Sequence, residues 1–120
     1  MIANRIRQTY EITPENVALD MDRVTAAYER LDTLLENCRY LVGDRFSRAD
    51  LTLAALAAPM WRPPEHSTYW PPDELYPHEI EAFRARFAKT RTREHVLRMY
   101  RMHRLPKLDA RGASAGTAAA

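Results

Sequence analysis

The chain has 120 residues, of which 46% are hydrophobic and 28% charged, as expected for one soluble globular domain. The single cysteine, Cys38, excludes an internal disulfide framework and fits a reducing cytoplasm. No stretch is long and apolar enough to span a membrane, and residues 1–10 lack the apolar core of a secretory signal. Strong helix formers dominate and no segment alternates like a strand, so we expect an all-α cytoplasmic protein.

Residues 1–9 give only a weak indication of the end of a helix. A clear helix start follows, because Thr13 can serve as N-cap and Pro14 occupies the first helical position, where its missing N–H costs nothing. Apolar residues then recur at spacings of three and four: Val17, Met21, Val24, Tyr28, Leu31, Leu35 and Cys38. This stripe predicts a long amphipathic helix that ends near residues 37–40.

Residues 43–51 carry a complete device for starting a helix. Ser47 can accept a hydrogen bond from the N–H of Asp50, whose carboxylate can return to the N–H of Ser47 as a capping box. Phe46 and Leu51 occupy the two positions of a hydrophobic staple, and Gly43 supplies the positive φ needed to leave the preceding helix. The helix that follows, 48–58, is apolar on nearly every face after its first turn, so we expect it to be buried and central.

The remaining segments predict two more helices and a tail. Residues 59–77 hold six of the eight prolines and both tryptophans, which indicates a stiff connection packed onto the domain by its aromatics. A third helix is expected from about Pro77, and a fourth from Thr92 to Arg104. Residues 110–120 are small and featureless and are expected to be disordered, which leaves a domain over 1–109.

The run Tyr40-Leu-Val-Gly-Asp-Arg-Phe-Ser-Arg-Ala-Asp-Leu-Thr resembles the signature of the all-helical C-terminal domain of cytosolic glutathione transferases. In that family a Y-L-x-G-D-x-F-S-x-A-D run leads into the buried helix at the centre of the domain. The resemblance is strongest over residues 14–60 and can be traced to about residue 104. It implies a helical bundle in which this domain packs on a thioredoxin-like domain and shapes the hydrophobic electrophile site.

The same resemblance implies that catalysis needs a part that this sequence does not show. In the family a thioredoxin-like N-terminal domain binds glutathione, the co-substrate, and activates its thiol. The chain has no βαβ pattern and no Cys-x-x-Cys motif, and we expect it to lack that domain and most of the helix that opens the C-terminal domain. No catalytic or cofactor-binding residue can therefore be carried over to it, and whether it is an enzyme stays open.

Other reactive side chains have structural interpretations. Cys38 continues the apolar stripe, so we expect an inert buried thiol, and the spacing of Asp50 from Ser47 favours a cap over a catalytic acid. Glu79 and Glu81 are expected to face different directions on a helix. The histidines form no i, i+4 pair, so no metal site is expected: His66, His78, His95 and His103. The aromatics of the connection are expected to cover the core rather than line a pocket: Trp61, Tyr69 and Trp70.

Ten basic residues lie between Arg84 and Arg111, against only two acids. They could form a patch for nucleic acid or an acidic partner. We favour a solvated helix face, because no nucleic-acid-binding motif accompanies the charges.

Two functions from different classes therefore remain. The first is a glutathione-transferase-like protein, represented by its C-terminal domain and not active alone. The alternative is a non-catalytic assembly module, as in the gamma subunit of a translation elongation factor complex and in some aminoacyl-tRNA synthetases. A fragment without independent function is a third possibility. Because uncovered apolar surface favours association, we expect self-association or a partner protein, such as a thioredoxin-like domain, with Val17, Met21 and Val24 near the contact.

Overall fold

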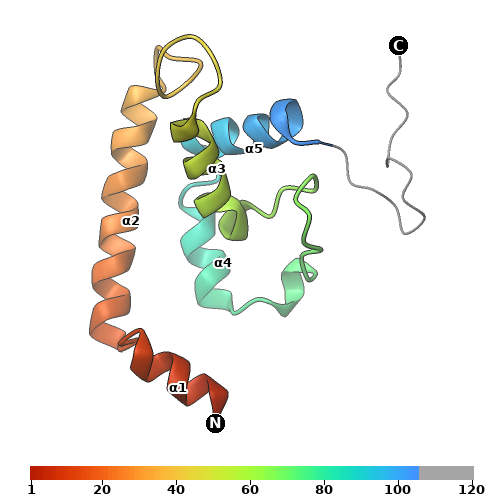
Figure 1. The fold of residues 1–120 in the computed structure, drawn as a ribbon. Helices are drawn as coiled ribbons and strands as arrows, with labels where there is room; N and C mark the ends of the chain where they lie inside the picture. The colour runs from red at the N-terminus through yellow and green to blue at the C-terminus, as the bar shows by residue number, and fades with distance from the viewer. Residues whose placement is uncertain (106–120) are drawn as a thin grey trace, which may run out of the picture.

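The computed structural model describes residues 1–105, and in this range the chain is helical and contains no strand (Figure 1). The elements are α1 (Ile2–Thr9), α2 (Pro14–Leu34), α3 (Arg48–Trp61), the 3₁₀ turn η1 (Asp73–Leu75), α4 (His78–Ala85) and α5 (Arg91–His103). The all-α prediction is confirmed. The expected disordered tail, 110–120, lies outside the described residues.

Helix α2 begins as its sequence predicts but ends early. The Thr13 side chain accepts a hydrogen bond from the N–H of Asn16, and Pro14 takes the first helical position. The helix ends at Leu34, so the predicted end near 37–40 is wrong. Leu35 still points into the core from the following turn, which prolongs the apolar period beyond the helix itself. Cys38 is exposed, and the prediction of a buried thiol is therefore wrong.

The core forms where α3 crosses α5. Three alanines of α3 are buried together with Val96 and Met99 of α5: Ala54, Ala57 and Ala58. Small side chains allow the two helices to approach closely. The opposite face of α3 differs from the prediction, because Leu51 and Leu56 are exposed. The helix is thus central but covered on one face only.

Helix α3 does not end at residue 58, where the sequence predicted its end, and Pro59 lies inside it. The helix continues to Trp61, and the N–H of Arg62 donates to the carbonyl of Ala58 at 2.7 Å. One missing donor therefore does not break the last turn, because packing of the buried Trp61 indole holds it in place. In the connection that follows, Trp70 packs against the core as expected, whereas Tyr69 is exposed.

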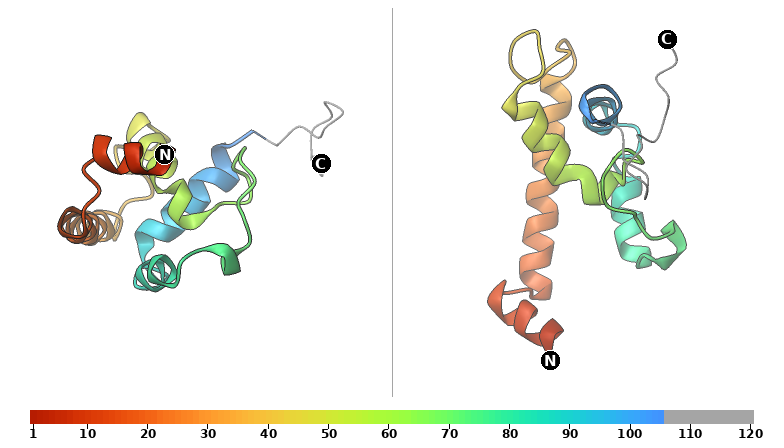
Figure 2. Two further views of the ribbon diagram at one scale, coloured as in Figure 1. Left: turned by 90° about the horizontal axis from the view of Figure 1, so that it is seen from below. Right: turned by 45° about the vertical axis from the view of Figure 1, so that its right-hand side comes forward.

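Helices α1 and α2 lie at one side of this core. In Figures 1 and 2, α2 stands along the edge of the molecule and α1 bends away from its N-terminal end. Tyr28 is the only buried residue of α2, and α1 has none. The N-terminal part of the fold therefore leaves much apolar surface uncovered.

None of the helices in residues 1–105 has the length and apolarity that a membrane crossing requires.

Candidate functional site

The start of α3 holds a buried carboxylate whose oxygens are all engaged. Asp50 is fully buried, and Ser47 and Asp50 form a capping box. Its Oδ2 accepts hydrogen bonds from the N–H and the hydroxyl of Ser47 at 2.9 and 2.8 Å, and its Oδ1 accepts from the N–H of Leu41 at 2.9 Å. Asp50 therefore ties the chain before α3 to its first turn, which is a structural task.

The other residues of the predicted motif surround this cap. Gly43 has a φ of +67°, and a Cβ added there would meet nothing within 4 Å, so the glycine serves the backbone angle rather than close packing. Phe46 is half-buried and its ring stacks on His103 with centroids 4.2 Å apart. Leu51 is exposed. The side chains of Phe46 and Leu51 line one small cavity, of about 260 Å³, between α3 and α5.

His95, for which the sequence predicted only that it binds no metal, is the fourth donor to Asp50. Its Nε2 lies 2.9 Å from Oδ1 of Asp50, and its Nδ1 lies 3.0 Å from a terminal nitrogen of Arg98. A guanidinium only donates, so Nδ1 accepts and the proton sits on Nε2. The sequence signal that could have indicated a buried His95 is its position beside Val96 on the apolar face of α5.

The protonation of this pair follows from burial and hydrogen bonding. Burial by itself raises the pKa of Asp50, but the hydrogen bonds from Leu41 and Ser47 outweigh it and lower the pKa below its usual value. Burial lowers the pKa of His95, and the attraction of Asp50 offsets this only in part. A neutral imidazole therefore donates to a charged carboxylate. With both ring nitrogens engaged, the pair has no free position for acid-base chemistry.

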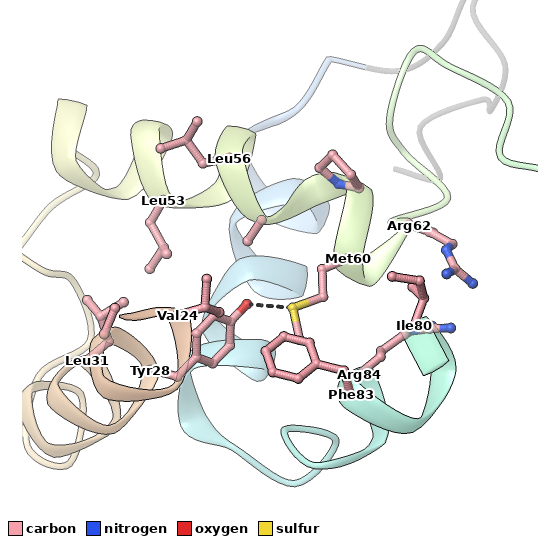
Figure 3. Close-up of a pocket in the computed structure, with 13 residues that line it drawn as sticks. Val24, Tyr28, Leu31, Leu53, Leu56, Met60, Arg62, Ile80, Phe83 and Arg84 are labelled. Carbon is pink, nitrogen blue, oxygen red and sulfur yellow. Dashed lines mark hydrogen bonds between the residues drawn. The ribbon is translucent and has the colours of Figure 1, made fainter. Parts of the chain in front are cut away.

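An apolar cleft of about 540 Å³ lies between α2, α3 and α4 (Figure 3). Its lining is almost entirely hydrocarbon: Val24, Ala27, Tyr28, Leu31, Leu53, Leu56, Ala57, Pro59, Met60, Arg62, Ile80, Phe83 and Arg84. The Tyr28 hydroxyl donates to the sulfur of Met60 at 3.4 Å and accepts from the indole N–H of Trp61 at 2.8 Å. Its volume and lining suit an apolar small molecule or a helix. The sequence did not predict this cleft, which requires the relative placement of three helices.

Two arginines and two carboxylates close one end of the cleft. The Arg62 side chain, only 5% exposed, donates to Asp73 at 2.6 Å and to Glu81 at 2.5 Å. Arg84 donates to the same two carboxylates at 3.2 and 3.0 Å. Hydrogen bonds from Arg62 are the main cause of the lowered pKa of both Asp73 and Glu81. The guanidinium of Arg62 also lies 3.3 Å from the centre of the Tyr76 ring. The four charges neutralise one another.

Comparison with protein families decides the assignment. Residues 9–90 match the family model described as "Glutathione S-transferase, C-terminal domain". This chain belongs to that family. Comparisons with curated proteins and with solved structures give no significant match. The resemblance carried by residues 40–52 is thereby confirmed, and the central α3 of this glutathione transferase C-terminal domain is the helix that the signature introduces.

The polar groups in the described lining of the cleft of this glutathione transferase C-terminal domain are few and engaged. The described residues that line it include no serine, cysteine, histidine or carboxylate, and the hydroxyl among them, on Tyr28, has a pKa raised by burial. Arg62 and Arg84 are already bound to carboxylates. Among the described residues, no group of three or more metal-ligating side chains comes together. The expectation that no catalytic, cofactor-binding or metal-binding residue lies in this chain stays a prediction.

The basic patch is largely satisfied within the domain. Four of its arginines have hydrogen-bond or ion-pair partners: Arg84, Arg91, Arg98 and Arg101. Arg86 and Arg93 lie over aromatic rings of Phe83 and Trp61. This pairing favours the interpretation as a solvated helix face over a nucleic-acid-binding surface. Residues 106–111 of the patch lie outside the described part of the chain.

Proposed function

We propose that this chain serves as the helical half of a glutathione-transferase-like protein and that its apolar cleft contributes to binding an electrophile. A thioredoxin-like half would bind glutathione, the co-substrate, and activate the thiol, so the chain alone would not catalyse conjugation. The observation that carries the proposal is an apolar cleft without a nucleophile, in a chain of this family. The proposal places the protein in the cytoplasm, where the exposed Cys38 would stay reduced.

The separation of electrophile binding from thiol activation follows from what thiol addition requires. The thiolate is the nucleophile, and a thiol is ionised at neutral pH when a positive charge or a hydrogen-bond donor faces the sulfur. The donors at the cleft are already committed, since Arg62 binds two carboxylates and the Tyr28 hydroxyl binds Met60. Burial of an apolar ligand, in contrast, is favourable by about 25 cal/mol per Å². The cleft thus supplies binding, and activation must come from other groups.

Binding and catalysis can be tested separately on the purified chain. A nitroaromatic electrophile, chlorodinitrobenzene, should quench tryptophan fluorescence saturably, because Trp61 adjoins Tyr28 in the cleft wall. Val24→Arg, at the rim, should weaken this binding at least tenfold. Val42→Arg, in the exposed connection before α3, is the matched control and should leave it unchanged. Adding glutathione should give conjugation at the uncatalysed rate only.

Two results would contradict the proposal. Quenching that is equal in the parent chain and in Val24→Arg would show that the ligand does not occupy the cleft. Turnover well above the uncatalysed rate, abolished by a substitution in this chain, would show that the chain activates the thiol itself.

An assembly role is the second candidate, and the uncovered apolar side chains of the N-terminal part favour it. They are Ile2, Ile6, Tyr10, Ile12, Val17, Leu19 and Val24. Contiguous apolar patches above a few hundred Å² are rare on monomers, so we propose self-association or a bound partner at this face, near Val17, Met21 and Val24. Light scattering across a dilution series distinguishes self-association from binding of another protein. A monomer at every concentration would remove self-association from the proposal.

A further inference from the structure

Helix α1 presents an apolar face that no other segment of residues 1–105 covers. Ile2, Ile6 and Tyr10 lie four residues apart, so they share one side of the helix, and they are 78%, 47% and 75% exposed. No residue of α1 is buried. Helices that bind in grooves use apolar anchors with this spacing.

The corner between α1 and α2 holds that helix away from its own domain. Glu11 has a φ of +49°, and its carbonyl accepts hydrogen bonds from the N–H of Thr13 and from the side-chain amide of Asn16, each at 2.8–2.9 Å. The N–H of Ile12 donates to the carbonyl of Arg7 at 2.9 Å. These bonds fix the bend, so α1 is a preorganised projection rather than a loose end. Figure 2 shows it bent away from the N-terminal end of α2.

The cleft between α2, α3 and α4 is open along one side, where its rim residues remain exposed. Leu56 is 78% exposed, Ile80 and Val24 are also exposed, and no residue of α1 lines the cleft. In Figure 3 the side chains of Leu53 and Val24 lie toward one end of the cleft and that of Ile80 toward the other. The described part of the chain therefore carries an apolar groove and an apolar helix that do not meet each other.

We propose that α1 of a second copy covers this cleft, and that two copies exchange their α1 helices reciprocally. Such an exchange is isologous, because each chain supplies both the helix and the groove, and it closes as a dimer without leaving either surface free. Charge supports this occupant: α1 carries Arg5 and Arg7 and no acid, whereas the carboxylate of Glu79 lies beside Ile80 at the rim of the cleft. Asp20, one turn before Val24, is already paired with Arg23 and adds no free charge.

The exchange of α1 helices extends the proposed function, because α1 of the partner copy would form the missing wall of the cleft that binds an electrophile. In this respect the exchange rests on the proposed function. The site would then be complete only in the dimer. Association through α1 nevertheless has its own readout, which does not depend on any electrophile.

Disulfide cross-linking tests the contact directly. In a Cys38→Ser background, chains carrying Ile6→Cys are mixed with chains carrying Leu56→Cys and are oxidised gently. We expect a covalent heterodimer from this mixture, and none when Val42→Cys replaces Leu56→Cys as the matched control. Absence of the heterodimer would overturn the proposal. So would an intrachain disulfide in a monomer carrying both Ile6→Cys and Leu56→Cys, which would show that α1 folds onto its own cleft.

A charge placed on the apolar face of α1 gives an independent measurement. Ile6→Glu should raise the dimer dissociation constant at least tenfold in sedimentation equilibrium, with an unchanged melting temperature of the monomer body. Gln8→Glu, the same charge on another side of α1, should change it by less than threefold. Equal dissociation constants for the two variants would overturn the proposal. Loss of electrophile binding with intact dimerisation would instead contradict only the proposed function.

Discussion

Nε2 of His95 donates to Oδ1 of Asp50 across 2.9 Å, in the interior where α5 meets α3. His95 is 2% exposed and Asp50 is fully buried. Together with Leu41 and Ser47, the imidazole completes four donors around one buried carboxylate. A buried charge is tolerated when its lone pairs are satisfied in this way. The pair therefore links the start of the central helix to the last helix of the domain.

This pair predicts that stability falls in mild acid. The pKa of His95 is lowered in the folded state. As pH falls below about 6.5, His95 therefore becomes protonated in the unfolded chain while it stays neutral in the folded chain. The free energy of unfolding should then decrease by at most about 1.4 kcal/mol per pH unit from this one group. The Asp50 contribution, with a lowered pKa, is lost only further down, below about pH 4.

Denaturant melts between pH 7.5 and 5 measure the His95 effect as a difference between variants. His95→Gln cannot titrate, so the pH dependence over this window should become shallower. His78→Gln, at the exposed start of α4, should keep the slope of the parent protein. Parallel slopes in all three proteins would mean that His95 is protonated equally in the folded and unfolded states.

The cap predicts unequal losses at its two members. Ser47→Ala removes one hydroxyl and should cost about 0.5–2 kcal/mol. Asp50→Ala leaves the N–H groups of Leu41 and Ser47 and the His95 ring without their acceptor, so it should cost about 3 kcal/mol or more.

The two losses should not add in the double variant, because the side chains bond each other. Ser67→Ala, at an exposed position of the connection, is the control and should be neutral. The midpoints of denaturant unfolding measure these losses. Equal losses for Ser47→Ala and Asp50→Ala would contradict the prediction that the Asp50 carboxylate contributes more stability than the Ser47 hydroxyl.

The exposed thiol predicts fast chemical modification. Cys38 is the one cysteine of the sequence and lies on the surface of the connection after α2. A disulfide reagent such as Ellman's should therefore label the native protein with one equivalent at the rate of a free thiol peptide. Cys38→Ser should abolish labelling. A rate that rises only on adding denaturant would indicate that the thiol is covered.

Local signals in the sequence were sufficient for the helices, and long-range geometry was not available from it. The caps of α2 and α3 use bonds between residues three apart, from Asn16 to Thr13 and between Ser47 and Asp50, so they could be predicted from spacing alone. The family signature then gave the fold class. The end of α2 was predicted too late in the sequence. Leu35 continues the apolar spacing and is buried, although the backbone has already left the helix at this residue.

The site required contacts between distant segments. Asp50 and His95 are 45 residues apart, and the cleft needs α2, α3 and α4 in place together. Helical periodicity shows that a face is apolar but not which element covers it. Leu56 therefore looked like core from its neighbours, although it lies on the open rim of the cleft.

Arg62 gives a prediction in which backbone and side chain act in opposite directions. It ends α3 in the left-handed region, with φ 49° and ψ 53°, where a residue with a Cβ is strained by roughly 1–2 kcal/mol. Its buried guanidinium compensates by binding Asp73 and Glu81. Arg62→Ala loses the guanidinium and keeps the strain, so it should be the least stable variant. Arg62→Gly loses the same contacts but relieves the backbone, and it should be more stable than Arg62→Ala by about 1 kcal/mol.

Thermal melts of these two variants isolate the backbone contribution, because both lack the same ion pairs. The matched pair at an ordinary helical position is Arg101→Ala and Arg101→Gly on the exposed side of α5, where glycine should be the less stable by roughly 1 kcal/mol. The order of alanine and glycine should thus reverse between the two sites. If glycine is the less stable at position 62 as well, α3 does not end in a left-handed residue there, and the end of the cleft that Arg62 closes is built differently.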